Sequence, residues 1–475
     1  MITSVRLPAL AGLVGLAACG APAPAQVDAA AGADAPRDAA AVPDAMPDAM
    51  PPLPPLPDPA RIAGPLTLDA WGAQPFLTPA PIDEVLQGGF SIGREFFVAA
   101  WVAAPSAQRP NLDGLGPLFH ATSCAACHPA TGRPASLGAN GAVAPGLLFR
   151  LAGPGGAPDP IFGGQLQPSG LAGAPAEATI TYAYAEAAPP GITPASARPV
   201  FAFATEPSYG ALAATTRALP RMSPHLAGMG LLERVPDAAI VAREDPLDAD
   251  GDGISGRAAR LPGGAIGRFG WKAVQPSLRG QTTAAFAADI GIASEDRADD
   301  CTAAQPACLA LPNGGAPEIA SADVRAVDTF QRYLGVPRAR RDNADPVIAR
   351  GYALFVAARC IACHAQTLTT GDAPDALAHV DFHPYTDLLL HDMGPGLADP
   401  LGEGDAAAAE WRTPPLWGLG LVAADPAARF LHDGRAATLA DAIRWHGGEA
   451  EVSRAAFAAL SPDDAAALLA FVASL

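Results

Sequence analysis

The stretch Cys124–His128 reads CAACH, and Cys360–His364 reads CIACH. Both follow the pattern Cys-x-x-Cys-His, in which two thiols bond to the vinyl groups of haem and the His becomes the proximal ligand of the iron. A thioredoxin-like dithiol does not need the His, and a four-cysteine zinc site needs both pairs brought together. We therefore predict two covalently bound haem c groups, held by Cys124, Cys127, His128, Cys360, Cys363 and His364.

Helical patterns accompany both motifs. Residues 346–358 place apolar side chains at helical spacing before the second motif, and a closing helix begins at Ser461 and Pro462. A similar helix begins at Ser321, after the first motif, and stops at Gly335. Both copies also have a Phe five residues before the first Cys, namely Phe119 and Phe355. The sequence thus predicts a mainly α protein of two tandem cytochrome c-like domains.

The predicted domains are unequal in length. The first haem domain is expected over residues 66–335 and the second over residues 336–475. Residues 140–265 are rich in Gly and Pro, and within them 179–184 and 200–204 alternate in the manner of short strands. We therefore expect a long irregular insertion with some β structure inside the first domain.

The N-terminal residues resemble an export signal. Residues 1–19 contain Arg6 and a short apolar run, and they end in Leu-Ala-Ala-Cys, which matches the lipobox of bacterial lipoproteins. Cys19 is the predicted lipidation site, with an ordinary secretory signal as the alternative. Residues 20–65 are dominated by Ala, Pro and Asp, so we predict a disordered tether. The expected location is the bacterial cell envelope, lipid-anchored and facing the periplasm or cell surface, with no transmembrane helix.

The composition restricts the partners. The chain has 475 residues, with 30 Lys+Arg against 48 Asp+Glu and a formal charge of -18. This balance argues against nucleic acid, because protein affinity for phosphates depends on basic side chains. It favours a small basic redox protein as the electron donor, with an association rate that falls with salt. The sequence indicates no particular oligomeric state.

The seven cysteines can all be assigned. One is the lipidation site and four belong to the haem motifs, which leaves Cys301 and Cys308. In an oxidising compartment these two predict a structural disulfide, and a redox-active dithiol is the alternative.

Several further runs resemble one enzyme family. Residues 411–418 and 430–439 are similar to the bacterial di-haem cytochrome c peroxidases and to their relatives that mature methylamine dehydrogenase. Residues 250–257, 267–273 and 445–450 resemble runs characteristic of the di-haem oxidoreductase family of peroxidase-like proteins, once labelled thiol oxidoreductases. The resemblance covers about 85–475. It implies that electrons enter at the C-terminal haem and reduce peroxide or another small oxidant at the N-terminal haem.

The resemblance also implies an iron ligand. In the peroxidases a Met fourteen residues after the His of the F-H-x-G motif binds the second haem, and here that position, counted from His432, is His446. We expect His364 and His446 to ligate the C-terminal haem, which lowers its potential relative to a Met ligand. Met393 is the alternative ligand.

The peroxide pocket is implied in the same way. Trp271 and Gln281 reproduce the spacing of a Trp between the haems and a Gln that orients peroxide, while Asp289 stands in for a Glu, two residues early. A carboxylate near the iron can take one proton and return it to the departing oxygen. The ordinary alternatives are a core Trp, a helix-surface Gln and a solvated Asp. Lys272, the only lysine, is either a pocket residue or a surface charge.

This chemistry needs a first haem with an open coordination position. No His follows His128 closely enough to close it. Candidate distal ligands further away are His120, Met222, His225 and Met229.

An acidic run predicts a cation site. Asp248, Asp250 and Asp252 precede Gly253 as D-x-D-x-D-G, and alternate carboxylates of this kind converge on Ca²⁺. The twelfth position is Ala259 rather than the usual Glu, so an acidic turn without metal is the alternative.

Two other functions compete with a peroxidase. One is a plain electron-transfer cytochrome in which both irons are six-coordinate. The other is a redox enzyme acting on a protein or thiol substrate, which an exposed, reducible pair Cys301–Cys308 would support.

Overall fold

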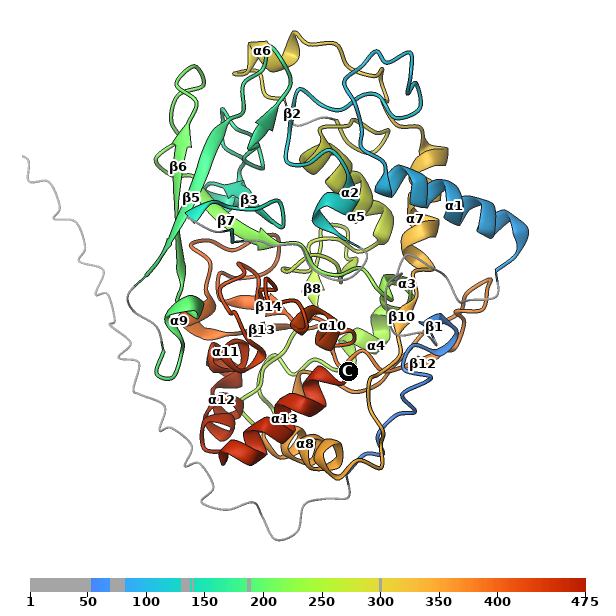
Figure 1. The fold of residues 1–475 in the computed structure, drawn as a ribbon, viewed down its shortest axis with the longest axis vertical. Helices are drawn as coiled ribbons and strands as arrows, with labels where there is room; N and C mark the ends of the chain where they lie inside the picture. Colours follow the sequence, from blue (N-terminus) through green and yellow to red (C-terminus); the bar gives the residue numbers. More distant parts are fainter. Residues whose placement is uncertain (1–52, 69–81, 130–136, 139–140, 186–188, 299–300) are drawn as a thin grey trace, which may run out of the picture. The chain divides into compact units, whose positions relative to one another are not determined.

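The computed structural model describes residues 53–68, 82–129, 137–138, 141–185, 189–298 and 301–475. All of them belong to one compact unit, residues 42–475 (Figure 1). The predicted signal segment, Cys19 and most of the predicted tether lie outside the described residues. Among the described residues, no helix combines the length and apolarity needed to cross a bilayer.

Helices and small sheets alternate along the chain, so "mainly α" is corrected to a mixed fold (Figure 1). The strands occur only as pairs in the described part, because Gly and Pro break the chain often. The longest pairs are β3 (Leu147–Ala152) with β7 (Arg217–Met222) and β5 (Ala178–Tyr184) with β6 (Pro199–Thr205), both antiparallel. The other strands are β1 (Thr67–Leu68), β2 (Leu118–Phe119), β4 (Ser169–Gly170), β8 (Ala259–Arg260), β9 (Ile266–Gly267), β10 (Val336–Pro337), β11 (Leu368–Thr369), β12 (Asp381–Phe382), β13 (Leu390–Asp392) and β14 (Glu410–Arg412).

Two pairs of long helices frame the fold. In the first half, α1 (Glu84–Val98) packs on α7 (Ser321–Arg332), and in the second half α8 (Pro346–Ala357) packs on α13 (Pro462–Ala473). The remaining α-helices are α2 (Cys124–Cys127), α3 (Met229–Glu233), α4 (Asp237–Val241), α5 (Leu278–Ala285), α6 (Pro306–Leu309), α9 (Gly394–Leu397), α10 (Leu419–Ala423), α11 (Leu439–Arg444) and α12 (Glu451–Ala458).

The two helix pairs use the same contacts. A Cβ on Gly93 would overlap the carbonyl oxygen of Ala326, and a Cβ on Gly351 would overlap that of Ala467, so only Gly permits these crossings. Four residues after each Gly, an aromatic ring packs across the crossing. The ring centroids of Phe97 and Phe330 are 5.1 Å apart, and those of Phe355 and Phe471 are 5.4 Å apart.

A glycine turn is also repeated. Residues 223–232 read SPHLAGMGLL and residues 413–422 read TPPLWGLGLV. Gly228 and Gly418 both have positive φ, 71° and 69°, and each precedes a short helix, α3 or α10. These helices pack against α7 and α13, respectively.

A longer repeat leads into α5 and α11. Residues 268–278 read RFGWKAVQPSL and residues 429–439 read RFLHDGRAATL, with the same length and no gap. Each contains an isolated antiparallel bridge between its second and eighth residues, at 269 and 275 in one copy and 430 and 436 in the other. Ser277 and Thr438 then cap their helices with a side-chain oxygen. When the gap-free alignment of the two copies is extended beyond residues 278 and 439, Ala285 aligns with His446.

The folded unit begins earlier than its composition suggested. Ile62 is fully buried, and β1 pairs in parallel with β10. Residues 53–65, the end of the predicted tether, therefore contain packed structure.

Candidate haem sites

The first site is built on α2. Ser123 caps this helix with its hydroxyl, and Cys124 and Cys127 carry free thiols. His128 donates its Nδ1–H to the carbonyl oxygen of Pro224 over 2.8 Å. This hydrogen bond fixes the tautomer and leaves Nε2 available to a metal.

The second site repeats this arrangement. Cys360 and Cys363 are free, a 3₁₀ turn covers Cys360–Ala362, and His364 donates Nδ1–H to the carbonyl oxygen of Tyr385 over 3.0 Å. Phe355 lies 6.4 Å from the His364 ring, centroid to centroid. In each predicted proximal His, Nδ1 is occupied by a hydrogen bond and Nε2 is left available to bind iron.

The structure corrects one predicted equivalence. Phe97 of α1 lies 6.4 Å from the His128 ring and so corresponds to Phe355, whereas Phe119 lies in β2. The spacing Gly93–Phe97, which matches Gly351–Phe355, is the sequence signal that would have identified the correct residue. Helix α1 ends at Val98, well before Cys124 in the sequence, whereas α8 ends at Ala357, just before Cys360. The Phe that packs near the His is therefore farther from its motif in the first half.

The thiols are not poised for dithiol chemistry. Burial raises the pKa of both Cys124 and Cys360 to about 12. Reactive Cys-x-x-Cys pairs have the opposite property, a lowered pKa that supplies thiolate. The raised pKa values therefore argue against thiol–disulfide exchange at these pairs.

His446 has the features of a second iron ligand. Its ring is half-buried, and Nδ1 donates to the carbonyl oxygen of Ala442 over 2.8 Å, which again leaves Nε2 available. Burial, together with the charge of the nearby His446, lowers the pKa of His364 to about 4. Met393, the alternative ligand, immediately precedes α9 and packs on the apolar cluster of the second half.

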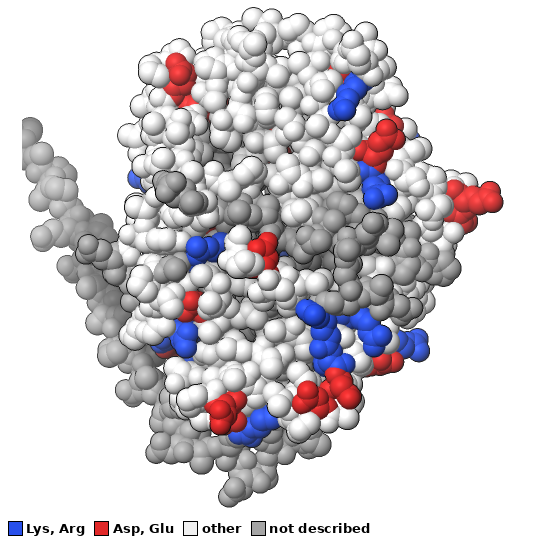
Figure 2. Space-filling model, viewed as in Figure 1, with Lys and Arg blue, Asp and Glu red and all other residues white. Residues whose placement is uncertain are grey.

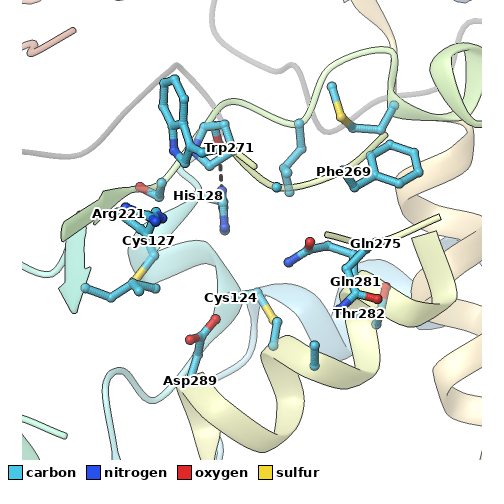
Figure 3. A pocket seen from close by; sticks show the side chains of 18 of the residues that line it. Cys124, Cys127, His128, Arg221, Phe269, Trp271, Gln275, Gln281, Thr282 and Asp289 are labelled. Atoms are coloured by element: carbon cyan, nitrogen blue, oxygen red, sulfur yellow. Dashed lines mark hydrogen bonds between the residues drawn. The ribbon is translucent and has the colours of Figure 1, made fainter. Parts of the chain in front are cut away.

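A cavity surrounds His128 (Figure 3). The structure brings Trp271, Gln281 and Asp289 together on its wall. Figure 3 shows Trp271 and Arg221 on one side of His128, Gln281 across the cavity from them, and Asp289 toward the cysteines. Apolar residues such as Phe97, Leu226 and Phe286 form other parts of the wall.

Asp289 is held by residues that the sequence did not reveal. It lies in a π-helical turn, Phe286–Ile290, a local distortion common at functional sites. Gln165 donates from Nε2 to Asp289 Oδ1 over 2.9 Å and to the carbonyl oxygen of Ala288 over 2.9 Å, and Gln167 donates to the same carbonyl over 2.7 Å. Both glutamines come from the Gly- and Pro-rich segment, where no pattern singled them out.

The indole of Trp271 is hydrogen-bonded to Met222, whose backbone is in turn hydrogen-bonded to the second half of the chain. Its Nε1–H donates to the carbonyl oxygen of Met222 over 2.7 Å, while the Met222 N–H donates to the carbonyl oxygen of His432 over 2.6 Å. Trp271 packs on the apolar cluster of the second half as well as on that of β3 and β7.

Neither reading of Lys272 was correct. Its side chain is fully buried and does not line the cavity. The ammonium donates to the carbonyl oxygens of Ala407 and Ala408 over 3.0 and 2.8 Å and lies 3.6 Å from the ring centre of Trp411. Burial lowers the pKa of Lys272 to about 8.

The candidate distal ligands of the first site fall into two groups. Met222, His225 and Met229 line the cavity, but His225 directly follows Pro224 and so belongs to the side of His128. His120 does not line it, and its Nε2 is bonded to the carbonyl oxygen of Pro145 over 2.7 Å.

The acidic run is arranged differently from the prediction. Carboxylates of Asp245, Asp248 and Asp250 lie within 4.8 Å of one another. Asp252 instead forms an ion pair with Arg359, directly before the second motif.

Cys301 and Cys308 form a disulfide, with their Cα atoms 5.9 Å apart. Cys308 is 1% exposed. Such burial gives a thiol substrate no access to that sulfur.

Two Cys-x-x-Cys-His sites on repeated helix pairs define a di-haem protein of the cytochrome type. Residues 215–475 match the family described as "Di-haem oxidoreductase, putative peroxidase". The match covers more than half of the chain, and the chain belongs to this family.

Two solved structures are similar at low identity. One is hydrazine synthase of Kuenenia stuttgartiensis, with 21% identity over 33% of this chain, 56% of that chain and a TM-score of 0.23. This chain thus spans little more than half of that protein. The other is a MauG-like protein associated with microbial copper homeostasis, with 16% identity over 53% of this chain, 89% of that chain and a TM-score of 0.27. No curated protein matches the chain.

Proposed function

We propose that the chain is a peroxidase-like enzyme with two covalently bound haem c groups, in which electrons entering at the second site reduce peroxide or another small oxidant at the first. One observation carries this proposal. The register of the repeat places Ala285, which lines the first cavity, where His446 stands in the second half. A methyl group cannot ligate iron, so Ala285 would leave a bound haem without the His ligand that His446 offers in the second half.

The residues of both sites fit haem. Each has two free thiols next to a His whose Nδ1 is occupied and whose Nε2 is available. When bound, haem would supply each site with a redox-active iron.

The polar groups of the first cavity suit peroxide cleavage. Asp289 Oδ1 is held by Gln165, while Oδ2 carries no hydrogen bond from the described residues. Oδ2 can therefore take a proton from one peroxide oxygen and return it to the other as the bond between them breaks. Gln281 contributes a neutral amide that can orient the peroxide without competing for that proton.

Trp271 supports an electron route between the sites. It lines the first cavity and also packs on the apolar cluster that contains Phe355 of the second site. Its fixed indole gives a contiguous packed path from one half to the other.

The decisive experiment combines spectroscopy with turnover. Electron paramagnetic resonance of the oxidised protein should show one high-spin and one low-spin haem, and peroxide should be consumed with a reduced cytochrome as donor. Two low-spin haems and no turnover would instead establish the electron-transfer cytochrome.

Export and the electron donor are part of the same proposal. Lipidation at Cys19 would place the enzyme in the cell envelope. That compartment is oxidising, so the Cys301–Cys308 disulfide can persist there, and it is compatible with haem c attachment. On the described part of the face in Figure 2, acidic and basic side chains are scattered over a largely uncharged surface. The preference for a basic donor therefore rests on the net charge of -18, and donor turnover should fall as salt is added.

Calcium binding is a further element of the proposal. Asp245, Asp248 and Asp250 supply the carboxylates. A chelator should then lower the thermal midpoint of the haem-loaded protein, and an unchanged midpoint and spectrum would remove calcium from the proposal.

A further inference from the structure

A buried chain of hydrogen bonds leads from the disulfide loop to the first cavity. Its side chains, those of Gln165, Gln167, Glu177 and Gln305, belong to residues that are each at most 2% exposed. It ends at Asp289, whose Oδ1 accepts from Gln165 Nε2. Of these four residues only Gln165 lines the cavity, and Glu177 and Gln305 have no role in the chemistry described so far. Buried polar groups need partners, so the partners of these two residues indicate what they do.

At the inner end of the chain, two amides meet on one peptide group. Gln165 Nε2 and Gln167 Nε2 both donate to the carbonyl oxygen of Ala288, over 2.9 and 2.7 Å. That carbonyl belongs to the planar peptide joining Ala288 to Asp289, so its direction determines where the Asp289 side chain leaves the backbone. Gln167 Oε1 has no hydrogen-bond partner among the described residues, so the amide keeps its donor on Ala288 at the cost of an unpaired oxygen. The segment 165–167 therefore orients Asp289.

Glu177 holds this segment in place. The Gln167 N–H donates to Glu177 Oε2 over 2.6 Å, and the Glu177 N–H donates to the carbonyl oxygen of Gln167 over 2.9 Å. Gln305 Nε2 donates to the other carboxylate oxygen, Glu177 Oε1. Two donors thus meet the two oxygens of one side chain. Only a carboxylate accepts at both positions, because the amide of a Gln would turn its own N–H groups towards one of the donors.

Gln305 is itself oriented by the disulfide loop. Its Oε1 accepts the N–H of Thr302 over 3.0 Å, and the Thr302 hydroxyl donates to the carbonyl oxygen of Ile161 over 2.6 Å. Both residues lie inside the loop that the Cys301–Cys308 disulfide closes. The oxygen of the Gln305 amide is therefore occupied within the loop, and its N–H group points to Glu177.

We propose that Glu177 and Gln305 are positioning residues for Asp289 and act on it through Gln167. The inference rests on the proposed function, in which Asp289 takes a proton from one peroxide oxygen and returns it to the other. This transfer requires the carboxylate within hydrogen-bond reach of the peroxide, and a displacement of about 1 Å can slow a reaction by about 100-fold. Neither positioning residue touches the peroxide, so each acts only through the direction of the peptide before Asp289.

The test uses the full-length, haem-loaded chain with hydrogen peroxide as substrate. Glu177→Gln sets a donor against a donor, and Gln305→Met removes the amide at similar length. The double change Glu177→Gln with Gln305→Glu exchanges the two groups. In this swapped chain the amide at 177 can donate to the carboxylate at 305, while the N–H groups of Gln167 and Thr302 each keep an acceptor. The exposed Glu95→Gln is the matched control.

Glu177→Gln and Gln305→Met should each lower kcat by about tenfold or more and change KM by less than about twofold, because peroxide still binds but the carboxylate is misplaced. Rates are compared per folded, haem-loaded chain, as judged by its absorption spectrum. The swapped chain should recover most of the rate, and Glu95→Gln should match the native chain. A merely structural network would lower the thermal midpoint but leave kcat unchanged. Native kcat in both single variants, or a swapped chain as slow as they are, would overturn the proposal.

Hydrogen exchange separates this inference from the proposed function. If the native chain does not turn over peroxide, the peroxidase proposal fails on its own. The positioning role then requires faster exchange of the backbone amides of residues 286–292 in both single variants, at native rates in the swapped chain and in Glu95→Gln. Exchange in α8, in the second half, should be unchanged in all four. Native exchange of residues 286–292 in both single variants overturns the positioning role.

Discussion

Replacing Asp328 by Asn should stabilise the protein at neutral pH. Folding raises the pKa of this carboxyl from 3.8 to about 6, so its ionised form is disfavoured in the native state. At about 1.4 kcal/mol per pH unit, this difference amounts to about 3 kcal/mol above pH 6. The penalty disappears below about pH 4, where the folded and unfolded states both hold the proton. Asparagine carries no charge at any of these pH values and so avoids the penalty.

Urea unfolding of the haem-loaded chain, followed by tryptophan fluorescence, measures this difference. The free energy of unfolding of Asp328→Asn should exceed that of the native chain by up to about 3 kcal/mol at pH 8 and approach it at pH 4. Asp342→Asn should track the native chain at both pH values, because Asp342 is exposed.

The opposite sign would refute the reasoning. If Asp328→Asn is less stable than the native chain at pH 8, the carboxylate is a favourable partner of Arg332 and Arg279.

Three further substitutions test the site and the fold. Ala285→His should convert the first haem to low spin in electron paramagnetic resonance and reduce peroxide turnover by at least about 100-fold, because a tethered imidazole competes at high effective concentration; a persistent high-spin signal would contradict the register of the repeat. Gln165→Met removes a hydrogen bond to the Asp289 carboxylate worth about 1.5–3 kcal/mol, so kcat should fall about 10- to 100-fold with little change in KM; a native kcat would show that Gln165 does not position Asp289. Gly93→Ala should destabilise the chain by about 1–3 kcal/mol through overlap with a backbone carbonyl, whereas Gly88→Ala on the same helix, with nothing within 4 Å of the new Cβ, should stabilise it by up to about 1 kcal/mol in chemical unfolding; equal effects would show that helix propensity alone governs both positions.

Local signals in the sequence were sufficient for three of the four long helices, α7, α8 and α13, but not for α1. The start of α13 follows from Ser461 and Pro462, and the Ser461 hydroxyl does accept the Asp464 N–H. The Cys-x-x-Cys-His spacing and the Trp271–Gln281 spacing also led to residues that meet at the cavity. Such signals work because caps and short motifs depend on neighbours in the chain.

Long-range contacts could not be predicted in this way. Gln165 reaches Asp289 across more than a hundred residues, and only the folded chain shows that its amide is needed there. Lys272 is another case. A lysine side chain is normally exposed to water, but here backbone carbonyl oxygens accept the hydrogen bonds that water would otherwise accept. The repeat at 268–278 and 429–439 was visible in the sequence, but pairing Ala285 with His446 required recognising both copies.

The loop after α4 limits how the chain can be divided. Arg359 pairs with Asp252, Ser255 hydrogen-bonds to Glu449, and a Cβ on Gly256 would overlap the ring of His391, so residues 252–256 form part of the surroundings of the second motif. A fragment starting at residue 336 would retain both cysteines and both histidines of that site but lose this wall. The family match begins at residue 215, which keeps the loop with the site it supports. The structural surroundings of the second site therefore extend beyond residues 336–475 to include the loop 252–256.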